Sequence, residues 1–60
     1  MASWEEQLYR VAQAQGMVSV QAGCDLDAAI EMMHERARVH HQSLNEIAKG
    51  VLNRTIRFGL

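Results

Sequence analysis

The chain has 60 residues, one cysteine, no proline and 48% hydrophobic residues, with six basic against seven acidic side chains. A chain this short forms one small domain with a thin core, which leaves no room for a deep active-site cleft. One cysteine excludes an internal disulfide and a cysteine-rich zinc module. The folded domain must therefore be stabilised by helix packing or by contact with a second chain, and we expect oligomerisation.

Charge is unevenly distributed along the chain. Residues 1–31 carry one arginine against five acidic side chains, whereas residues 32–60 carry five basic side chains against two acidic ones, together with all three histidines. The basic half is the part that can meet a nucleic acid, and a solvated helical surface is the plain alternative. Apolar runs are too short to cross a membrane, and Glu5 and Glu6 stand where a signal peptide is basic, so we expect a cytoplasmic location without membrane contact.

A first helix is predicted over residues 3–21. Ser3 can cap it, and Glu5 and Glu6 suit its first turn. The residues predicted to form its buried side are Trp4, Leu8, Val11, Val18 and Ala22, with Met17 and Val20 also assigned to the core. Gly16 lies inside this helix, where glycine is unfavourable, so a close approach by another backbone in the packed domain, or by a ligand, is expected there. Gly23 suits the left-handed end of the helix.

A second helix is predicted over residues 26–41. Asp25 stands before the periodic run and can cap it. The predicted buried stripe consists of Leu26, Ala29, Ile30, Met33 and Ala37. Charged side chains at 31, 35, 36 and 38 are expected to lie off that stripe.

A third helix is predicted over residues 44–57. Ser43 with Glu46 three residues later forms a capping box, the sharpest local signal in the chain. The predicted buried side consists of Leu44, Ile47, Ala48, Val51, Thr55 and Phe58, and the side turned away from it carries Lys49, Asn53, Arg54 and Arg57. Gly50 is expected to serve close packing. The three segments together predict an all-α fold, a small three-helix bundle.

Motifs for catalysis are missing from the chain. There is no Gly-x-Ser-x-Gly, no glycine-rich phosphate loop and no His-Glu-x-x-His. His34 and His41 are seven residues apart, which is not the spacing of two metal ligands on one helix. Glu31 and Glu35 are expected on an open helix surface, where nothing raises a carboxyl pKa for acid catalysis. We therefore expect no enzyme, no metal, no cofactor and no small-molecule substrate.

Three sequence blocks carry a resemblance to a known family. They are Gln13-Ala14-Gln15-Gly16-Met17, then Asp27-Ala28-Ala29 through Met33 to Ala37, and Leu44-Asn45-Glu46-Ile47-Ala48 followed by Val51-Leu52. In their order and spacing they resemble the ANTAR domain, the RNA-binding output module of bacterial transcription antitermination regulators, most closely the branch that follows a GAF sensor domain. The likeness extends over about residues 8 to 58.

The resemblance implies a domain organisation and a mode of action. Residues 1–7 would be an N-terminal helical lead-in, and residues 8–60 an ANTAR-like three-helix domain. Family members bind hairpin loops in nascent messenger RNA, steady an antiterminator and act as dimers, so an mRNA leader and a second copy of the chain are the expected partners. The alanines at 14, 29, 37 and 48 match the small positions of the family and are assigned to helix packing.

The expected RNA-binding residues are Gln13, Gln15, Gly16, Arg36, Lys49 and Arg54. The two glutamines would present amides where Gly16 permits close approach, and the three cations would contact phosphates. Gln15 stands where many members of the family have lysine, which implies one phosphate contact fewer. The competing hypothesis is a helical dimerisation or protein-interaction module that binds no nucleic acid. A small DNA-binding domain with the third helix as its reader is a further alternative.

Overall fold

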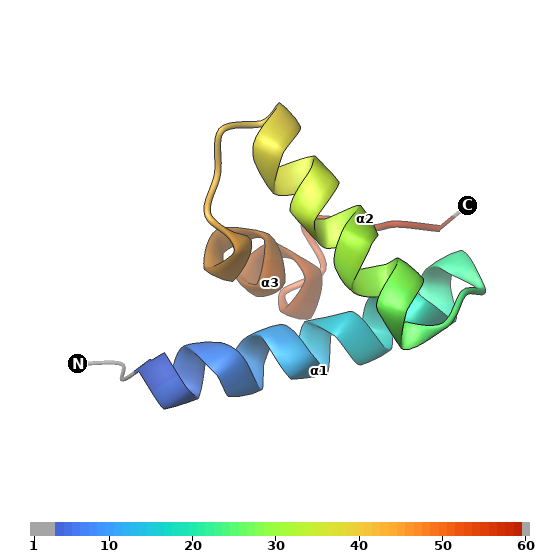
Figure 1. Ribbon diagram of the computed structural model, residues 1–60, viewed down its shortest axis with the longest axis horizontal. Helices are drawn as coiled ribbons and strands as arrows, with labels where there is room; N and C mark the ends of the chain where they lie inside the picture. Colours follow the sequence, from blue (N-terminus) through green and yellow to red (C-terminus); the bar gives the residue numbers. More distant parts are fainter. Residues whose placement is uncertain (1–3, 60) are drawn as a thin grey trace.

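The computed structural model describes residues 4–59, and in that range it contains three helices: α1 (Trp4–Ala22), α2 (Leu26–Val39) and α3 (Leu44–Leu52). In Figure 1, α1 lies along one edge, α2 runs away from the end of α1 at an angle, and α3 fills the space between them. The predicted all-α three-helix bundle is confirmed. None of these helices has the length and apolar character that a membrane span requires.

The core is built from small residues that let the helix backbones approach one another. Ala14, Ala29 and Ala48 are completely buried and Ala37 is 8% exposed, so the packing role expected of the four alanines is confirmed. The remaining volume is filled by Val18, Met33, Ile47 and Val51, each with no exposed surface. Because no charged or polar side chain of the described residues is fully buried, apolar packing holds the three helices together.

Local capping fixes the starts of α2 and α3. The Asp25 carboxylate accepts a hydrogen bond from Ala28 N at 2.8 Å. Ser43 Oγ accepts from Glu46 N at 3.0 Å, and Ser43 N donates to Glu46 Oε1 at 3.3 Å, which completes the capping box. Both caps satisfy backbone N–H groups that the helix itself leaves free. The cap predicted at Ser3 lies outside the described residues.

The buried side predicted for α1 is wrong at its N-terminal end. Trp4 is 68% exposed and Leu8 is 59% exposed, whereas the buried residues of α1 are Ala14 and Val18. α1 has 19 residues against 14 in α2 and nine in α3, so its first turns extend beyond the helices that cover the rest of it. Val20, also assigned to the core, is 83% exposed, and Leu26 in the predicted stripe of α2 is 54% exposed.

α2 ends at Val39, two residues before the end predicted from sequence at residue 41. His40 N donates to Arg36 O, and His41 then takes a left-handed conformation with φ +53°. This turn brings Gln42 N to Ala37 O at 2.9 Å, so a carbonyl at the end of the helix is satisfied by a residue beyond it. Glycine and asparagine are the usual residues at such a position, and a histidine there gave no signal of the helix end.

α3 ends at Leu52 and not at residue 57, because the chain reverses after it. Arg54 has a left-handed φ of +67°, and Thr55 N and Ile56 N both donate to Gly50 O, at 2.9 and 3.0 Å. Asn53 Oδ1 accepts from Thr55 N at 3.0 Å, which favours the reversal over another helical turn. Thr55, predicted to be buried, is therefore exposed and outside the helix.

Residues 53–59, here called the strap, pass from the end of α3 across the bundle, beyond α2 in the view of Figure 1. Ile56 packs directly on Gly50. A side chain at residue 50 would place its Cβ within 2.7 Å of Ile56 Cγ1, so the packing role expected of Gly50 is confirmed. Phe58 N donates to Gln21 Oε1 of α1 at 3.1 Å. Ile56 and Phe58 both pack against the core. The strap therefore joins the C-terminal end of the chain to α1.

Candidate nucleic-acid interface

The strap and α1 enclose a small pocket that carries two arginines. Its volume is about 270 Å³, and its lining, here called the basic notch, consists of Met17, Gln21, Arg54, Ile56 and Arg57. No carboxylate lines the notch. Two guanidinium groups over an apolar floor can contact a phosphate while a ribose or a base lies against the apolar side chains.

Gln21 orients the strap and faces the notch at the same time. Its Oε1 accepts the hydrogen bond from Phe58 N, and its NH₂ group has no partner among the described residues. A carboxamide held at its oxygen presents its two N–H bonds outwards, where a phosphate or a base can accept them. A Cβ at Gly59 would meet the Gln21 backbone, 2.9 Å from Gln21 C, so the strap lies close against α1 at this point.

A second pocket of about 460 Å³ adjoins the notch along α1. It is lined by Gln13, Gly16, Met17, Val20 and Gln21, so it shares Met17 and Gln21 with the notch. A Cβ at Gly16 would meet nothing within 4 Å, and the expectation that Gly16 serves packing inside the domain is therefore wrong. The surface above Gly16 is open to a ligand or to another chain, and Gln13 lies beside it.

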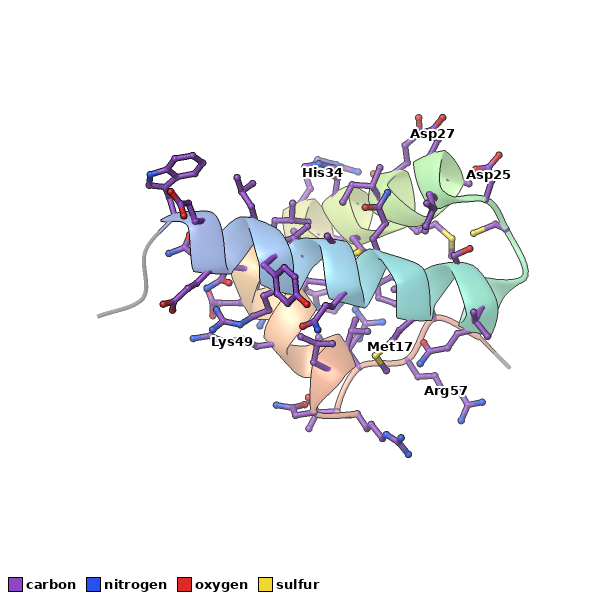
Figure 2. All side chains as sticks on the ribbon, turned by 90° about the horizontal axis from the view of Figure 1, so that it is seen from below. Met17, Asp25, Asp27, His34, Lys49 and Arg57 are labelled. Atoms are coloured by element: carbon purple, nitrogen blue, oxygen red, sulfur yellow. The ribbon has the colours of Figure 1, made fainter. Side chains whose placement is uncertain are left out.

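Lys49 lies on the same side of α1 as the notch. Figure 2 shows Lys49, Met17 and Arg57 on one side of α1, and Asp25, Asp27 and His34 on the other. One turn before Lys49 in α3, Asn45 Oδ1 accepts a hydrogen bond of 2.8 Å from Arg10 Nη1, which joins α1 to α3. Lys49 and Arg57 from the basic half of the sequence thus lie on the opposite side of α1 from Asp25 and Asp27 of the acidic half.

The cations on this side are free to meet an anion. Lys49, Arg54 and Arg57 are exposed, and none of their side chains makes a hydrogen bond or an ion pair with another described residue. Arg38, by contrast, forms an ion pair with Glu35 on α2. These three side chains are here called the basic face.

Two of the residues proposed from sequence lie away from the basic face. Gln15 Nε2 donates to Leu26 O at 2.7 Å, so this amide joins α1 to the start of α2. A lysine could donate to the same carbonyl, but the amide does so without placing a charge between the helices. Arg36 is half-buried on α2, with its guanidinium carbon 5.7 Å from the centre of the Phe58 ring.

Met17, Gln21 and Arg57 were not among the residues proposed from sequence. Met17 was assigned to the core, and it does pack against the core, but its side chain also lines both pockets beside α1. Arg57 was placed on a helix that in fact ends five residues earlier, at Leu52. No sequence signal links Gln21 to residue 58, because the reversal after α3 brings them together.

The histidine, cysteine and acidic side chains of the described residues form no further site. No group of three or more His, Cys, Asp or Glu side chains there is placed to hold a metal ion. Cys24 is half-buried and packs against the core, as a small apolar filler does.

Comparison with known families decides the classification. A sequence model of the ANTAR domain matches residues 7–52. The chain belongs to the ANTAR domain family. ANTAR domains are regulatory RNA-binding modules of antitermination regulators and not enzymes. No significant match was found among curated proteins or among solved structures. The ANTAR match includes all of α2 and α3 and ends where the strap begins, so Arg54 and Arg57 lie outside it.

Proposed function

We propose that this ANTAR domain binds hairpin loops in nascent mRNA through its basic face, and that it thereby favours an antiterminator over a terminator hairpin. The observation that carries the proposal is the basic notch, where Arg54 and Arg57 meet the Gln21 amide with no carboxylate in the lining. Unpaired cations beside an apolar floor suit a looped RNA, in which phosphates and unstacked bases are both accessible.

Lys49 and the open surface over Gly16 extend the proposed contact. Lys49 lies on the same side of α1 as Met17 and Arg57, so one RNA backbone can pass the notch and continue towards α3. Gln13 borders the pocket that adjoins the notch and offers an amide to the same RNA. No acidic residue of α2 lines the notch or the pocket that adjoins it, which lowers electrostatic repulsion of phosphate.

The matched experiment compares two sets of arginine substitutions. Binding of a two-hairpin leader RNA is measured by fluorescence anisotropy, with duplex DNA as a competitor and at two salt concentrations. Arg54→Gln with Arg57→Gln should lower RNA affinity about tenfold or more, because each removes a phosphate contact. Arg38→Gln is the control, since Arg38 is an exposed arginine of α2 outside the notch. Equal affinity for the double variant and the control would refute the assignment of the basic face.

We further propose that the domain acts as a homodimer through the first turns of α1. Trp4, Leu8 and Tyr9 are 68%, 59% and 68% exposed, and the bundle of the same chain does not cover them. Exposed large apolar side chains within two turns of one helix suit a helix-to-helix contact with a second copy. Two linked RNA sites would also raise the apparent affinity without any new contact.

The dimer has its own test. Sedimentation equilibrium of the wild type should show concentration-dependent association, and Leu8→Glu should shift the protein to monomer. Leu26→Glu is the matched control, since Leu26 is 54% exposed but lies at the start of α2. A wild type that stays monomeric at high concentration would contradict the dimer. A wild type that dimerises but binds no RNA would favour the alternative, a helical interaction module.

A further inference from the structure

A pocket of about 550 Å³ lies on the α2 side of the strap, away from the basic notch. Its apolar lining is Met32, Val39 and Phe58, and its polar lining is Glu31, Glu35, Arg36 and His40. Neither Arg54 nor Arg57 reaches it. We call it the Phe58 pocket. It is distinct in charge from the notch, because two carboxylates border it, and these repel a phosphate.

Arg36 is held in the Phe58 pocket by its contact with the aromatic ring. Its guanidinium carbon lies 5.7 Å from the centre of the Phe58 ring, a cation–π contact. Its Nε is covered and has no hydrogen-bond partner in the described part of the chain, and the nearby glutamates form no ion pair with it. A half-exposed aromatic ring and an unpaired guanidinium are the groups on which proteins place unstacked bases.

Glu31 supplies an acceptor beside this ring. Glu31 is exposed and its carboxylate forms no hydrogen bond or ion pair with another described residue, whereas Glu35 pairs with Arg38. A free carboxylate accepts hydrogen bonds from the amino groups of a base edge, and guanidinium N–H groups donate to ring nitrogens or carbonyl oxygens. The lining therefore matches the uncharged face and edge of a nucleobase better than it matches a backbone.

The strap connects this pocket to the basic notch. Phe58 also lines a fourth pocket, of about 510 Å³, together with Val20 and Gln21. Gln21 in turn lines the notch that holds Arg54 and Arg57. An RNA whose backbone lies in the notch therefore has a continuous surface along the strap, with Phe58 at its far side.

We propose that the Phe58 pocket receives one unpaired loop base of the bound RNA, and that Glu31 makes it select a base with an exocyclic amino group over uracil. This proposal rests on the proposed RNA-binding function and adds to it a site for base recognition. Phe58 and Glu31 would set which loops are bound, while Arg54 and Arg57 would hold the backbone of any loop.

The test uses the full chain and a pool of RNA hairpins with one fixed stem and a randomised loop. Bound hairpins are recovered and sequenced, and the affinities of single hairpins are measured by fluorescence anisotropy. The wild type should enrich adenine, cytosine or guanine over uracil at one loop position. Glu31→Gln should shift that preference towards uracil, because an amide can donate to a uracil carbonyl. Asp27→Asn, at an exposed carboxylate of α2 outside the pocket, should leave the preference unchanged.

Phe58→Leu provides a second measurement. It keeps an apolar side chain for the strap but removes the ring, so affinity for the selected hairpin should fall about fivefold or more. Circular dichroism and thermal unfolding measure whether this variant is folded. If it is unfolded, the Glu31→Gln variant still tests the proposal, because Glu31 is exposed and its substitution does not disturb the core. If Arg54→Gln with Arg57→Gln abolishes binding of the whole pool while Glu31→Gln leaves the loop preference unchanged, the base pocket is refuted and RNA binding stands. If the wild type binds no member of the pool, both proposals fail.

Discussion

Gly50 and Gly16 are both helical glycines, but their surroundings are opposite. A Cβ at Gly50 would lie 2.7 Å from Ile56 Cγ1, whereas a Cβ at Gly16 would meet nothing within 4 Å. The helical position alone gives no way to tell the two apart. Their difference arises from the strap, which returns over α3 and leaves α1 open at residue 16.

Substituting alanine at the two positions should therefore change stability in opposite directions. Gly50→Ala should lower the free energy of unfolding by about 1–3 kcal/mol, because the added methyl group forces Ile56 from its place. Gly16→Ala should raise it by up to about 1 kcal/mol, since alanine is the better helix former and no neighbour obstructs it. Urea denaturation followed by circular dichroism measures both. A destabilised Gly16→Ala would mean that this surface is already covered by another chain.

His41 offers a second comparison at the scale of one residue. His41 has a left-handed φ of +53°, and the preceding His40 has φ −97°. His41→Gly should stabilise the domain by up to about 1 kcal/mol, because glycine adopts the left-handed conformation without strain. His40→Gly should instead destabilise it, since glycine only adds freedom to the unfolded chain there. The melting temperatures of the two variants check this; a lower value for His41→Gly than for the wild type would contradict it.

At the scale of elements, the strap is the segment that completes the bundle. Ile56 covers Gly50 of α3, Phe58 N is bound by Gln21 of α1, and the Phe58 ring lies against Arg36 of α2. One short segment without regular structure therefore contacts every helix.

The packing of the strap on α3 can be tested by a double-mutant cycle. Ile56→Ala should lower the free energy of unfolding by about 1–2 kcal/mol, less than for a fully buried isoleucine because Ile56 is half-buried. In the combined Gly50→Ala and Ile56→Ala variant the two losses should not add, since the smaller side chain at 56 leaves space for the methyl group at 50. Strictly additive losses would show that the two residues are not in contact.

The starts of α2 and α3 were predictable from sequence and their ends were not, whereas α1 ends at Ala22, one residue beyond its predicted end, with Gly23 left-handed (φ +65°) as expected. Asp25 and Ser43 cap their helices through residues three positions away, so the signal is local. The ends of α2 and α3 depend on left-handed residues that are neither glycine nor asparagine. The end of α3 also depends on packing between the strap and α1, which no local pattern encodes.

The residues of the candidate site could likewise be predicted from sequence where they lie on helices, but not where the strap positions them. Lys49 of α3 and the surface residues Gln13 and Gly16 of α1 lie on or beside one side of the domain, because helix periodicity sets the direction of a side chain. Arg54 lies on this side because the chain reverses after α3. Arg57 joins them only through the strap, which also turns Met17 and Gln21 of α1 into part of the notch lining. Helix periodicity placed Arg36 off the buried stripe of α2, but the Phe58 ring covers part of it.

For the whole molecule, the separation of charge determines how binding depends on salt. With Lys49, Arg54 and Arg57 each on one phosphate, the logarithm of RNA affinity should fall with the logarithm of salt concentration with a slope of about −2. Arg57→Gln should reduce the magnitude of the slope by about 0.7. Anisotropy titrations over a series of salt concentrations give both values. The Asp27→Asn control should leave the slope unchanged, and an unchanged slope for Arg57→Gln would remove this residue from the contact.

The position of the strap also bears on how the domain forms during protein synthesis. Phe58 N reaches back 37 residues to the Gln21 side chain, and the strap packs on helices that were all made before it. A ribosome therefore releases α1, α2 and α3 before the strap that packs on them. The native packing cannot be complete until Phe58 has left the exit tunnel, so the nascent helices pass through a stage in which the strap does not yet cover them.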